Sequence, residues 1–134
     1  LRRICRFAVD QITNQPRHQR VYTILFHRCE RVGDINPAVA RQDELIDELL
    51  ELLEQQFRRA QALGRMDPTM PPRIAAEALH AYLAGLYSQY LRDPRECDLD
   101  GHAAHFIEAF LGRLLTPAAP DSAHATPPTT GTAY

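Results

Sequence analysis

Side chains that can bind metals or carry out thiol chemistry cluster in the stretch ILFHRCERVGD, which holds His27, Cys29 and Glu30. The surrounding apolar pattern predicts a helix, in which each residue turns by about 100°. His27 and Cys29 then face nearly opposite sides, so one helix cannot bring them onto a metal ion or pair them as base and nucleophile. Cys29 shares a face with Tyr22 and Leu25, where a free cysteine packs as a small apolar side chain. We therefore predict a packed Cys29 and a polar, partly exposed His27 that pairs with Glu30 or with a neighbouring helix.

A second constellation, CDLDGHAAH, holds His102 and His105 three residues apart, a spacing that puts two metal ligands on one helix face. The same stretch carries the signals of a helix N-terminus, with Asp98 as the N-cap and Asp100 complementing the helix dipole. An H-x-x-H pair alone is a weak signal for a metal site. We predict the helix start and no metal ion or other cofactor, with metal binding by the two histidines as the alternative.

Motifs for covalent or phosphate chemistry are missing from the sequence, which has no Gly-rich phosphate loop, no G-x-S-x-G and no paired carboxylates. We predict that the protein is not an enzyme. Two alternatives remain: a small α-helical enzyme that uses Cys29 or His80, and a helical protein–protein interaction module without a small-molecule site. An enzyme should lose turnover on a Cys29→Ser change, and a pure interaction module should show no thermal shift with any apolar ligand.

Length and composition predict one globular domain. The 134 residues suit a single domain, and 45% hydrophobic with 24% charged residues is typical of a soluble protein. The formal net charge of −2 lacks the basic excess of a nucleic-acid-binding domain, so we expect no intrinsic DNA binding. No apolar run approaches the roughly eighteen residues of a membrane span, and three widely spaced cysteines favour the reducing cytoplasm. Because the chain does not begin with Met, we expect a piece of a longer protein.

Helical periodicity runs through most of the chain, and no stretch alternates apolar and polar residues as a half-buried strand would. Proline and glycine signals divide the pattern into five predicted helices, at residues 1–13, 16–32, 37–63, 72–91 and 99–115. Such helices joined by short loops predict an all-α, antiparallel helical bundle over residues 1–115. Residues 116–134, rich in Pro, Thr and Ala, are predicted to form a disordered tail.

Small residues recur at helical spacing on the last two predicted helices. They are Ala78, Ala81, Gly85 and Ser88 on one helix, and Ala104 and Gly112 on the other. A glycine inside a helix costs about 1 kcal/mol relative to alanine, so its presence indicates a close approach of another helix. The approaching helix belongs either to a second subunit or to the same chain, and periodicity alone does not choose between the two.

Four stretches carry a resemblance to a known family. They are RVYTILFHRCE (20–30), RRAQALGRMDP (58–68), RIAAEALHAYLAGLYSQYL (73–91) and DPRECDLDGHAAHFIEAFL (93–111). In order and spacing they resemble the AcrR-like branch of the TetR family of transcriptional repressors, and the resemblance covers residues 1–115. It implies a TetR C-terminal-domain-like fold that binds ligands and dimerises.

The resemblance also implies partners. Operator DNA would be bound only through an N-terminal helix-turn-helix, which the printed sequence does not include. The last two helices would form a four-helix bundle across the axis of a homodimer. A hydrophobic or aromatic effector would bind among the middle helices and relieve repression, as in AcrR-like members that control multidrug efflux pumps. No membrane partner is implied.

Carried onto this sequence, the resemblance implies pocket-facing residues on the first four helices. They are Ile4, Cys5, Ala8, Tyr22, Phe26, Gln42, Ile46, Leu49, His80, Leu83, Ala84 and Tyr87. Tyr22, Gln42 and His80 would orient a ligand by hydrogen bonds, and the others are apolar walls or small. This mixture is typical of drug-sized sites. Without the resemblance, the same stripes would be interpreted as ordinary core.

The resemblance places the dimer interface on the last two helices. The residues that we assign to it are Ala81, Gly85, Ser88, Ala104, Glu108, Leu111 and Gly112. The small members let the helix axes approach closely, as in the small-residue pattern above.

Overall fold

The computed structural model describes residues 1–27 and 37–116, and the side chains of residues 1–23 and 40–116. The predictions for Cys29 and Glu30, and for the tail from residue 117 onward, therefore lie outside the described residues. His27 is described only as the last residue of a helix.

The described residues form five helices and no strand, which confirms the predicted all-α fold. The helices are α1 (Arg2–Asn14), α2 (Pro16–His27), α3 (Pro37–Ala62), α4 (Pro72–Arg92) and α5 (Ala103–Leu114). Pro16, Pro37 and Pro72 each occupy a first helical position. Proline suits that position because its fixed φ is helical and its missing N–H would have no helical partner there.

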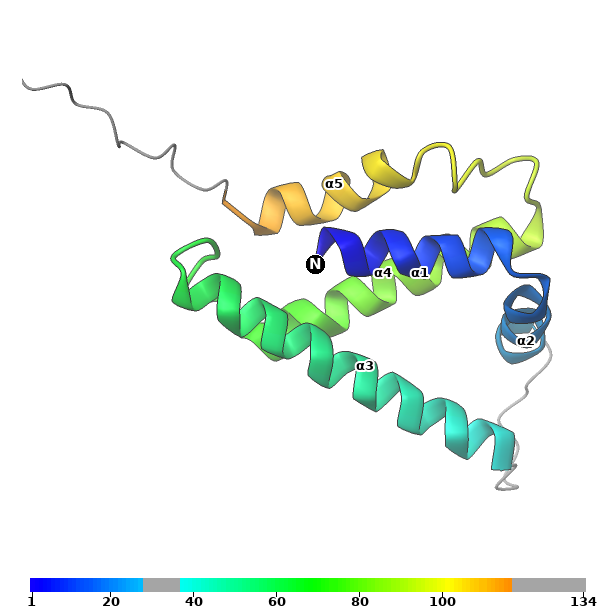
Figure 1. Cartoon of the computed structure of the whole chain (residues 1–134), viewed down its shortest axis with the longest axis horizontal. Helices are drawn as coiled ribbons and strands as arrows, with labels where there is room; N and C mark the ends of the chain where they lie inside the picture. Colours follow the sequence, from blue (N-terminus) through cyan, green and yellow to red (C-terminus); the bar gives the residue numbers. More distant parts are fainter. Residues whose placement is uncertain (28–36, 117–134) are drawn as a thin grey trace, which may run out of the picture.

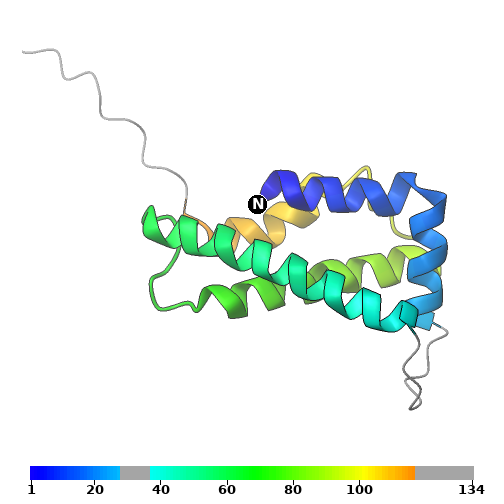
Figure 2. The ribbon, with the colours of Figure 1, turned by 60° about the horizontal axis from the view of Figure 1, so that its bottom comes forward.

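Helices α3 and α4 form an antiparallel pair, and α1 packs along α5 on the other side of α4 (Figure 1). The short α2 contacts both α1 and α4 and closes one end of the bundle (Figure 2). Within the part of the chain that the structure describes, no helix combines the length and apolarity that crossing a bilayer requires.

The core draws residues from every helix whose side chains are well described. Its largest fully buried members are Phe57, Ile12, Leu53, Leu79, Leu99, Leu111, Val9 and Cys5. On α1 the buried residues Cys5, Val9 and Ile12 recur at steps of four and three, which is the spacing of one helix face. Burying each such aliphatic side chain stabilises the fold by about 1.5–3 kcal/mol.

Helix α3 ends at the predicted glycine signal. Gly64 adopts a φ of 66°, which only glycine reaches without strain. The amide of Arg65 donates to the carbonyl of Ala60 at 2.9 Å and the amide of Gly64 to Gln61 at 3.0 Å, the two bonds of a Schellman motif. The amide of Thr116, the first residue of the predicted tail, donates to the Arg65 carbonyl at 2.8 Å. This bond ties the end of α5 to the α3–α4 turn.

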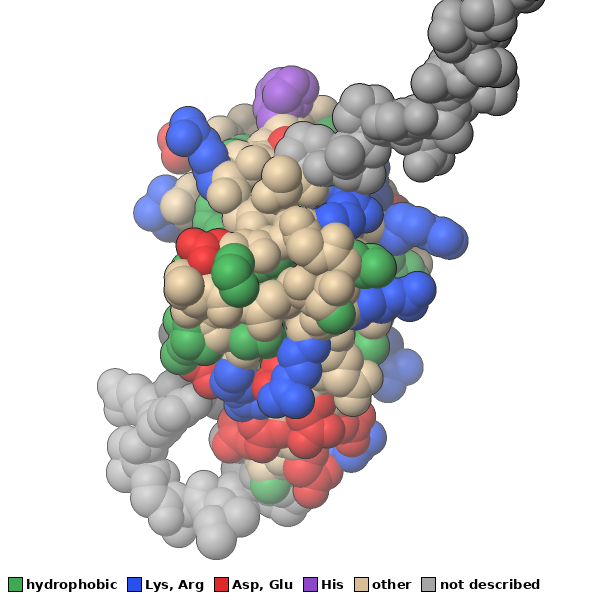
Figure 3. Space-filling view, turned by 90° about the vertical axis from the view of Figure 1, so that its left-hand side faces the viewer, with side chains coloured by type: hydrophobic (Ala, Val, Ile, Leu, Met, Phe, Trp, Pro, Cys, Tyr) green, Lys and Arg blue, Asp and Glu red, His purple; other side chains and the backbone are tan. Residues whose placement is uncertain are grey.

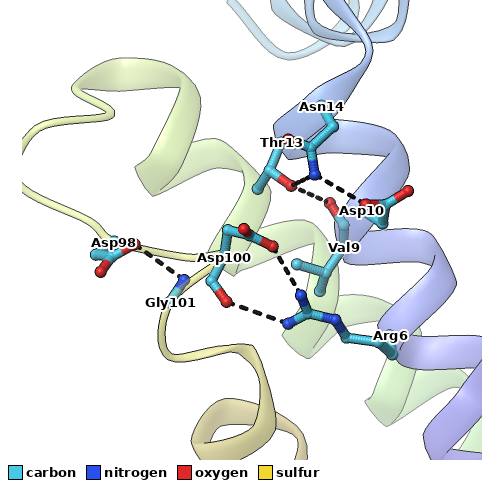
Figure 4. Close-up of polar contacts among 8 residues, drawn as sticks. All are labelled: Arg6, Val9, Asp10, Thr13, Asn14, Asp98, Asp100 and Gly101. Atoms are coloured by element: carbon cyan, nitrogen blue, oxygen red, sulfur yellow. Dashed lines mark hydrogen bonds and ion pairs between the residues drawn. The ribbon is translucent and has the colours of Figure 1, made fainter.

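Helix α5 begins at Ala103, four residues later than predicted. Asp98 does not cap it: its carboxylate accepts the amide of Gly101 at 3.0 Å and closes a turn instead (Figure 4). The N-cap position belongs to His102. The prediction was wrong because Asp stabilises turns and helix starts by the same hydrogen bond, and because Gly101 disfavours a helix at this point.

The turn before α5 is held against α1 by a charged pair. Arg6 donates to the carboxylate of Asp100 at 2.9 Å and to its carbonyl at 3.1 Å (Figure 4). Asp100 was predicted to complement the dipole of α5, and the structure shows it serving this contact between helices. One turn earlier on α1, Arg2 pairs with Glu108 of α5 through two hydrogen bonds. The two pairs fix the register of α1 on α5.

Acidic side chains gather on the outer face of the first half of α3. The exposed members are Asp43, Glu44, Asp47, Glu48 and Glu51. Figure 3 shows a group of acidic side chains, in red, at the lower end of the face that it draws. The charge of α3 therefore faces solvent, while its Leu53 and Phe57 face the core.

Candidate functional site

The twelve predicted ligand-facing residues divide by burial into two groups. Cys5, Leu83 and Tyr87, from α1 and α4, are buried. Eight are partly buried, namely Ile4, Ala8, Tyr22, Gln42, Ile46, Leu49, His80 and Ala84. Phe26 lies on α2, but its side chain is outside the described part. We call the three buried residues the floor and the eight partly buried residues the rim. Five of the rim residues pack against the buried core, namely Ile4, Ala8, Tyr22, Ile46 and Leu49.

Tyr87 is the member of this floor that carries a hydroxyl group. Its ring packs edge-on against Tyr22 of α2, with ring centroids 6.1 Å apart and an interplanar angle of 63°. Its side chain is 7% exposed, and its hydroxyl has no hydrogen-bond partner among the described residues. A buried polar group without a partner costs about 1–3 kcal/mol, so such groups are uncommon in native folds.

The ionisable groups around Tyr87 are held in their neutral forms. Burial raises the pKa of Tyr87, and the neighbouring Tyr22 and Cys5 raise it further. Burial also raises the pKa of the Tyr22 hydroxyl and of the Cys5 thiol. Burial lowers the pKa of His80, which favours the neutral imidazole. The result is an uncharged surface that still carries hydrogen-bonding atoms.

The lowered pKa of His80 predicts a loss of stability in mild acid. In the unfolded chain the His80 imidazole takes up a proton near pH 6.5, whereas in the folded chain it does so only at a lower pH. The free energy of unfolding should therefore fall as the pH drops from 7.5 through 6.5 to 5.5. The slope should stay below about 1.4 kcal/mol per pH unit for one such group. Urea titrations at each pH measure it. His80→Gln should flatten part of the slope, and His18→Gln, which removes an exposed histidine of α2, should not. Equal slopes in wild type and His80→Gln would contradict the burial of His80.

The small residues of α4 and α5 lie at the surface of the isolated chain. Ala81, Gly85, Ala104, Glu108 and Gly112 are exposed and Ser88 is partly buried. A Cβ atom built on Gly85 would meet nothing within 4 Å. The packing of one subunit therefore does not require glycine at this position, which disfavours the interpretation that the stripe serves packing within the chain.

Leu111 does not belong to the predicted interface. Its side chain is 0% exposed and sits in the core, so a second subunit cannot contact it. It lies at the edge of the buried face of α5, beside the exposed Ala104 and Glu108, and periodicity did not separate the two faces there. Glu108 remains accessible, but both of its carboxylate oxygens pair with Arg2.

His102 and His105 lie edge-on to each other, with ring centroids 6.0 Å apart. Nowhere in the described ranges do three or more His, Cys, Asp or Glu side chains converge as a metal site would need.

Sequence reasoning missed a different feature, a shallow and open depression of about 400 Å³ on the outer face of α1, lined by Arg3, Arg6, Phe7 and Asp10. Phe7 is 64% exposed there. The sequence could have predicted this exposure, because Phe7 lies two residues from the buried Cys5 and therefore on the opposite face of the helix.

The bundle resembles that of known transcriptional repressors. Two crystal structures of NalD, the secondary repressor of the MexAB-OprM multidrug efflux pump in Pseudomonas aeruginosa, match it with a TM-score of 0.77 and 37% sequence identity. The matches cover 89% of this chain and 61% and 60% of the NalD chains. The chain therefore shares its all-α fold with the matched part of NalD, which is a transcriptional repressor.

The family follows from a second comparison. Residues 1–116 match the model of the MAATS-type transcriptional repressor, C-terminal region, and the chain belongs to this branch of the TetR family. It is 28% identical over 111 residues to the HTH-type transcriptional repressor BepR of Brucella suis biovar 1 (strain 1330), covering 83% of this chain and 53% of BepR. It is 25% identical over 115 residues to the HTH-type transcriptional regulator AcrR of Shigella flexneri, covering 86% of this chain and 54% of AcrR. The chain thus spans about half the length of these relatives.

Proposed function

We propose that this chain is the effector-sensing and dimerisation region of a TetR-family repressor that controls a multidrug efflux pump. The family membership supports the regulatory role, and the role of NalD as a repressor of a multidrug efflux pump supports the efflux target. The observation that carries the effector site is the buried Tyr87 hydroxyl without a described partner, in a floor of apolar side chains. Binding sites for drug-sized molecules are mostly apolar and hold a few such polar groups.

The proposed effector lies among α1 to α4. Phe26, Ile46, Leu83 and Tyr87 form apolar walls. Tyr22, Gln42 and His80 supply hydrogen bonds at the rim, where all three are only partly buried. A hydrophobic or aromatic molecule fits this composition, because it removes apolar rim surface from water on binding.

The repressor acts on operator DNA through an N-terminal helix-turn-helix that lies outside the printed sequence. This region itself does not contact DNA, because phosphate binding needs basic surface, whereas the net charge is −2 and the outer face of α3 is acidic.

The subunits pair through the exposed small-residue face of α4 and α5. A stable interface of this kind buries roughly 2,000 Å² or more in total. Effector binding changes the separation of the two DNA-binding heads, and the repressor works in the cytoplasm.

A saturating aromatic ligand should stabilise the chain. At 100 times its dissociation constant, a ligand such as 2-acetonaphthone should raise the free energy of unfolding by about 2.7 kcal/mol. Micromolar affinity is expected, because ordering the ligand offsets much of the gain from burial. Urea unfolding with and without the ligand measures the stabilisation, and calorimetry measures the affinity. No shift with any apolar ligand would favour the interaction module instead.

The helical register of α2 gives this prediction a matched pair of variants. Phe26→Ala should weaken binding of 2-acetonaphthone more than Cys29→Ala does, because only Phe26 is expected to face the ligand. If Phe26→Ala leaves the affinity unchanged while Cys29→Ala abolishes it, the helical register that we expect from the sequence of residues 16–32 is wrong.

A further inference from the structure

We propose that the effector is an uncharged aromatic molecule whose hydrogen-bond acceptor is bound by the Tyr87 hydroxyl. This inference rests on the proposed function and names the chemical class that the site selects. Three features of the described residues carry it: an unpartnered donor, the absence of buried charged residues and a rim of only partly buried side chains.

The contrast between two tyrosines of α4 identifies the donor. Tyr82 donates its hydroxyl proton to the carbonyl of Phe106 at 2.9 Å, and its ring stacks on Phe110 at 5.3 Å. Tyr82 is thereby fully used in joining α4 to α5. Tyr87, five residues later and more deeply buried, has a ring contact with Tyr22 but no described partner for its hydroxyl. If the ring at position 87 served packing alone, phenylalanine would fill the same space without the free-energy cost of burying an unpaired hydroxyl.

The surroundings of Tyr87 determine which partner suits it. No charged residue is buried among the described side chains. The Tyr87 hydroxyl keeps its proton, since burial raises its pKa, and so it is a donor. A ligand carbonyl or ether oxygen would complete its hydrogen bond. An ionised ligand group would enter a region without a counter-charge, and burying an unpaired charge is strongly unfavourable.

Access to Tyr87 comes through the rim. Tyr22 of α2, Ile4 and Ala8 of α1 and Ala84 of α4 are all partly buried, although they pack around or next to the core. Ala84 lies three residues before Tyr87 on the same side of α4, and its side chain is small and only partly buried. A flat aromatic molecule inserted here would stack against Tyr22 and bring its acceptor to the hydroxyl.

Four probes that share a naphthalene ring and differ in the substituent at position 2 separate the possibilities. They are 2-acetonaphthone, 2-isopropenylnaphthalene (in which CH₂ replaces the ketone oxygen), naphthalene-2-carboxylate and the 2-naphthyltrimethylammonium ion. Calorimetry on the wild-type chain should give an affinity for the ketone about three- to tenfold above that for the alkene, the worth of one hydrogen bond. The two ions should bind at least roughly tenfold more weakly than the ketone.

Two matched variants assign the effect to Tyr87. Tyr87→Phe should remove the preference for the ketone over the alkene, and Tyr82→Phe should keep it. In the free protein, Tyr87→Phe should leave the urea midpoint unchanged or raise it, because no described hydrogen bond is lost. Tyr82→Phe should lower the midpoint, since it removes the bond to Phe106.

The outcomes separate this inference from the proposed function. If the alkene binds but the ketone preference persists in Tyr87→Phe, or if either ion binds as tightly as the ketone, only the inference on ligand class is overturned. A fall in the urea midpoint of Tyr87→Phe as large as that of Tyr82→Phe would show that the hydroxyl has a partner within the chain, and would overturn it as well. If none of the four probes binds, both the inference and the proposed effector site fail.

Discussion

Replacing Gly85 by Leu should dissociate the proposed homodimer while leaving the subunit folded. Inserting a large side chain into a packed interface costs about 1–3 kcal/mol, and a two-fold interface contains the change twice. The dissociation constant should therefore rise by roughly thirtyfold or more. Within the subunit the change is harmless, because a Cβ at Gly85 meets nothing within 4 Å and helix propensity gains up to about 1 kcal/mol.

Sedimentation velocity across a dilution series measures the dimer, and far-ultraviolet circular dichroism confirms that the variant stays helical. Gln55→Leu is the control, because it adds the same side chain to an exposed position of α3, away from the proposed interface. A Gly85→Leu protein that remains dimeric at micromolar concentration would remove the interface from this face of α4. A wild-type chain that is monomeric there would exclude the homodimer.

Replacing Phe57 by Ala should cost about 3–5 kcal/mol of unfolding free energy. Phe57 is 0% exposed and is the largest of the fully buried side chains. Its removal loses the transfer energy of the ring and leaves a cavity among residues of α3 and α4 that cannot fully collapse. Domains of this size have about 5–15 kcal/mol in total, so the variant should be close to unfolding at 37 °C.

Urea denaturation at 25 °C measures this loss. Leu52→Ala, five residues earlier on α3 and 43% exposed, should change the free energy by well under 1 kcal/mol. A loss at Phe57 no larger than that at Leu52 would mean that α3 presents a different face to the core.

The fold was predictable where its signals are local. Pro16, Pro37 and Pro72 mark helix starts through their own backbone geometry, and Gly64 ends α3 through a φ that other residues avoid. Such signals do not depend on the rest of the chain. The start of α5 was not predictable in this way, because the carboxylate of Asp98 can accept a hydrogen bond in a turn as well as at a helix start. The contact of Asp100 with Arg6, 94 residues away in sequence, could not be predicted from local signals either.

The candidate site was predictable only as a set of helix faces. Periodicity placed Cys5, Leu83 and Tyr87 on inward faces, and all three are buried. It could not show that the Tyr87 hydroxyl has no hydrogen-bond partner among the described residues, because this depends on how α1, α2 and α4 pack against one another. The resemblance led us to assign Leu111 to the dimer interface, and the sequence could not show that this side chain is buried within the subunit.

Methyl-resolved NMR of the chain titrated with 2-acetonaphthone tests most directly whether a small aromatic molecule binds among α1 to α4. We expect saturable shifts, in the micromolar range, at the methyl groups of Ile4, Ile46 and Leu83. The exposed Ile74 and Leu63 should not move, since they lie outside the proposed site. Shifts confined to Ile74 and Leu63, or none at any of the five residues, would contradict an effector site in this bundle.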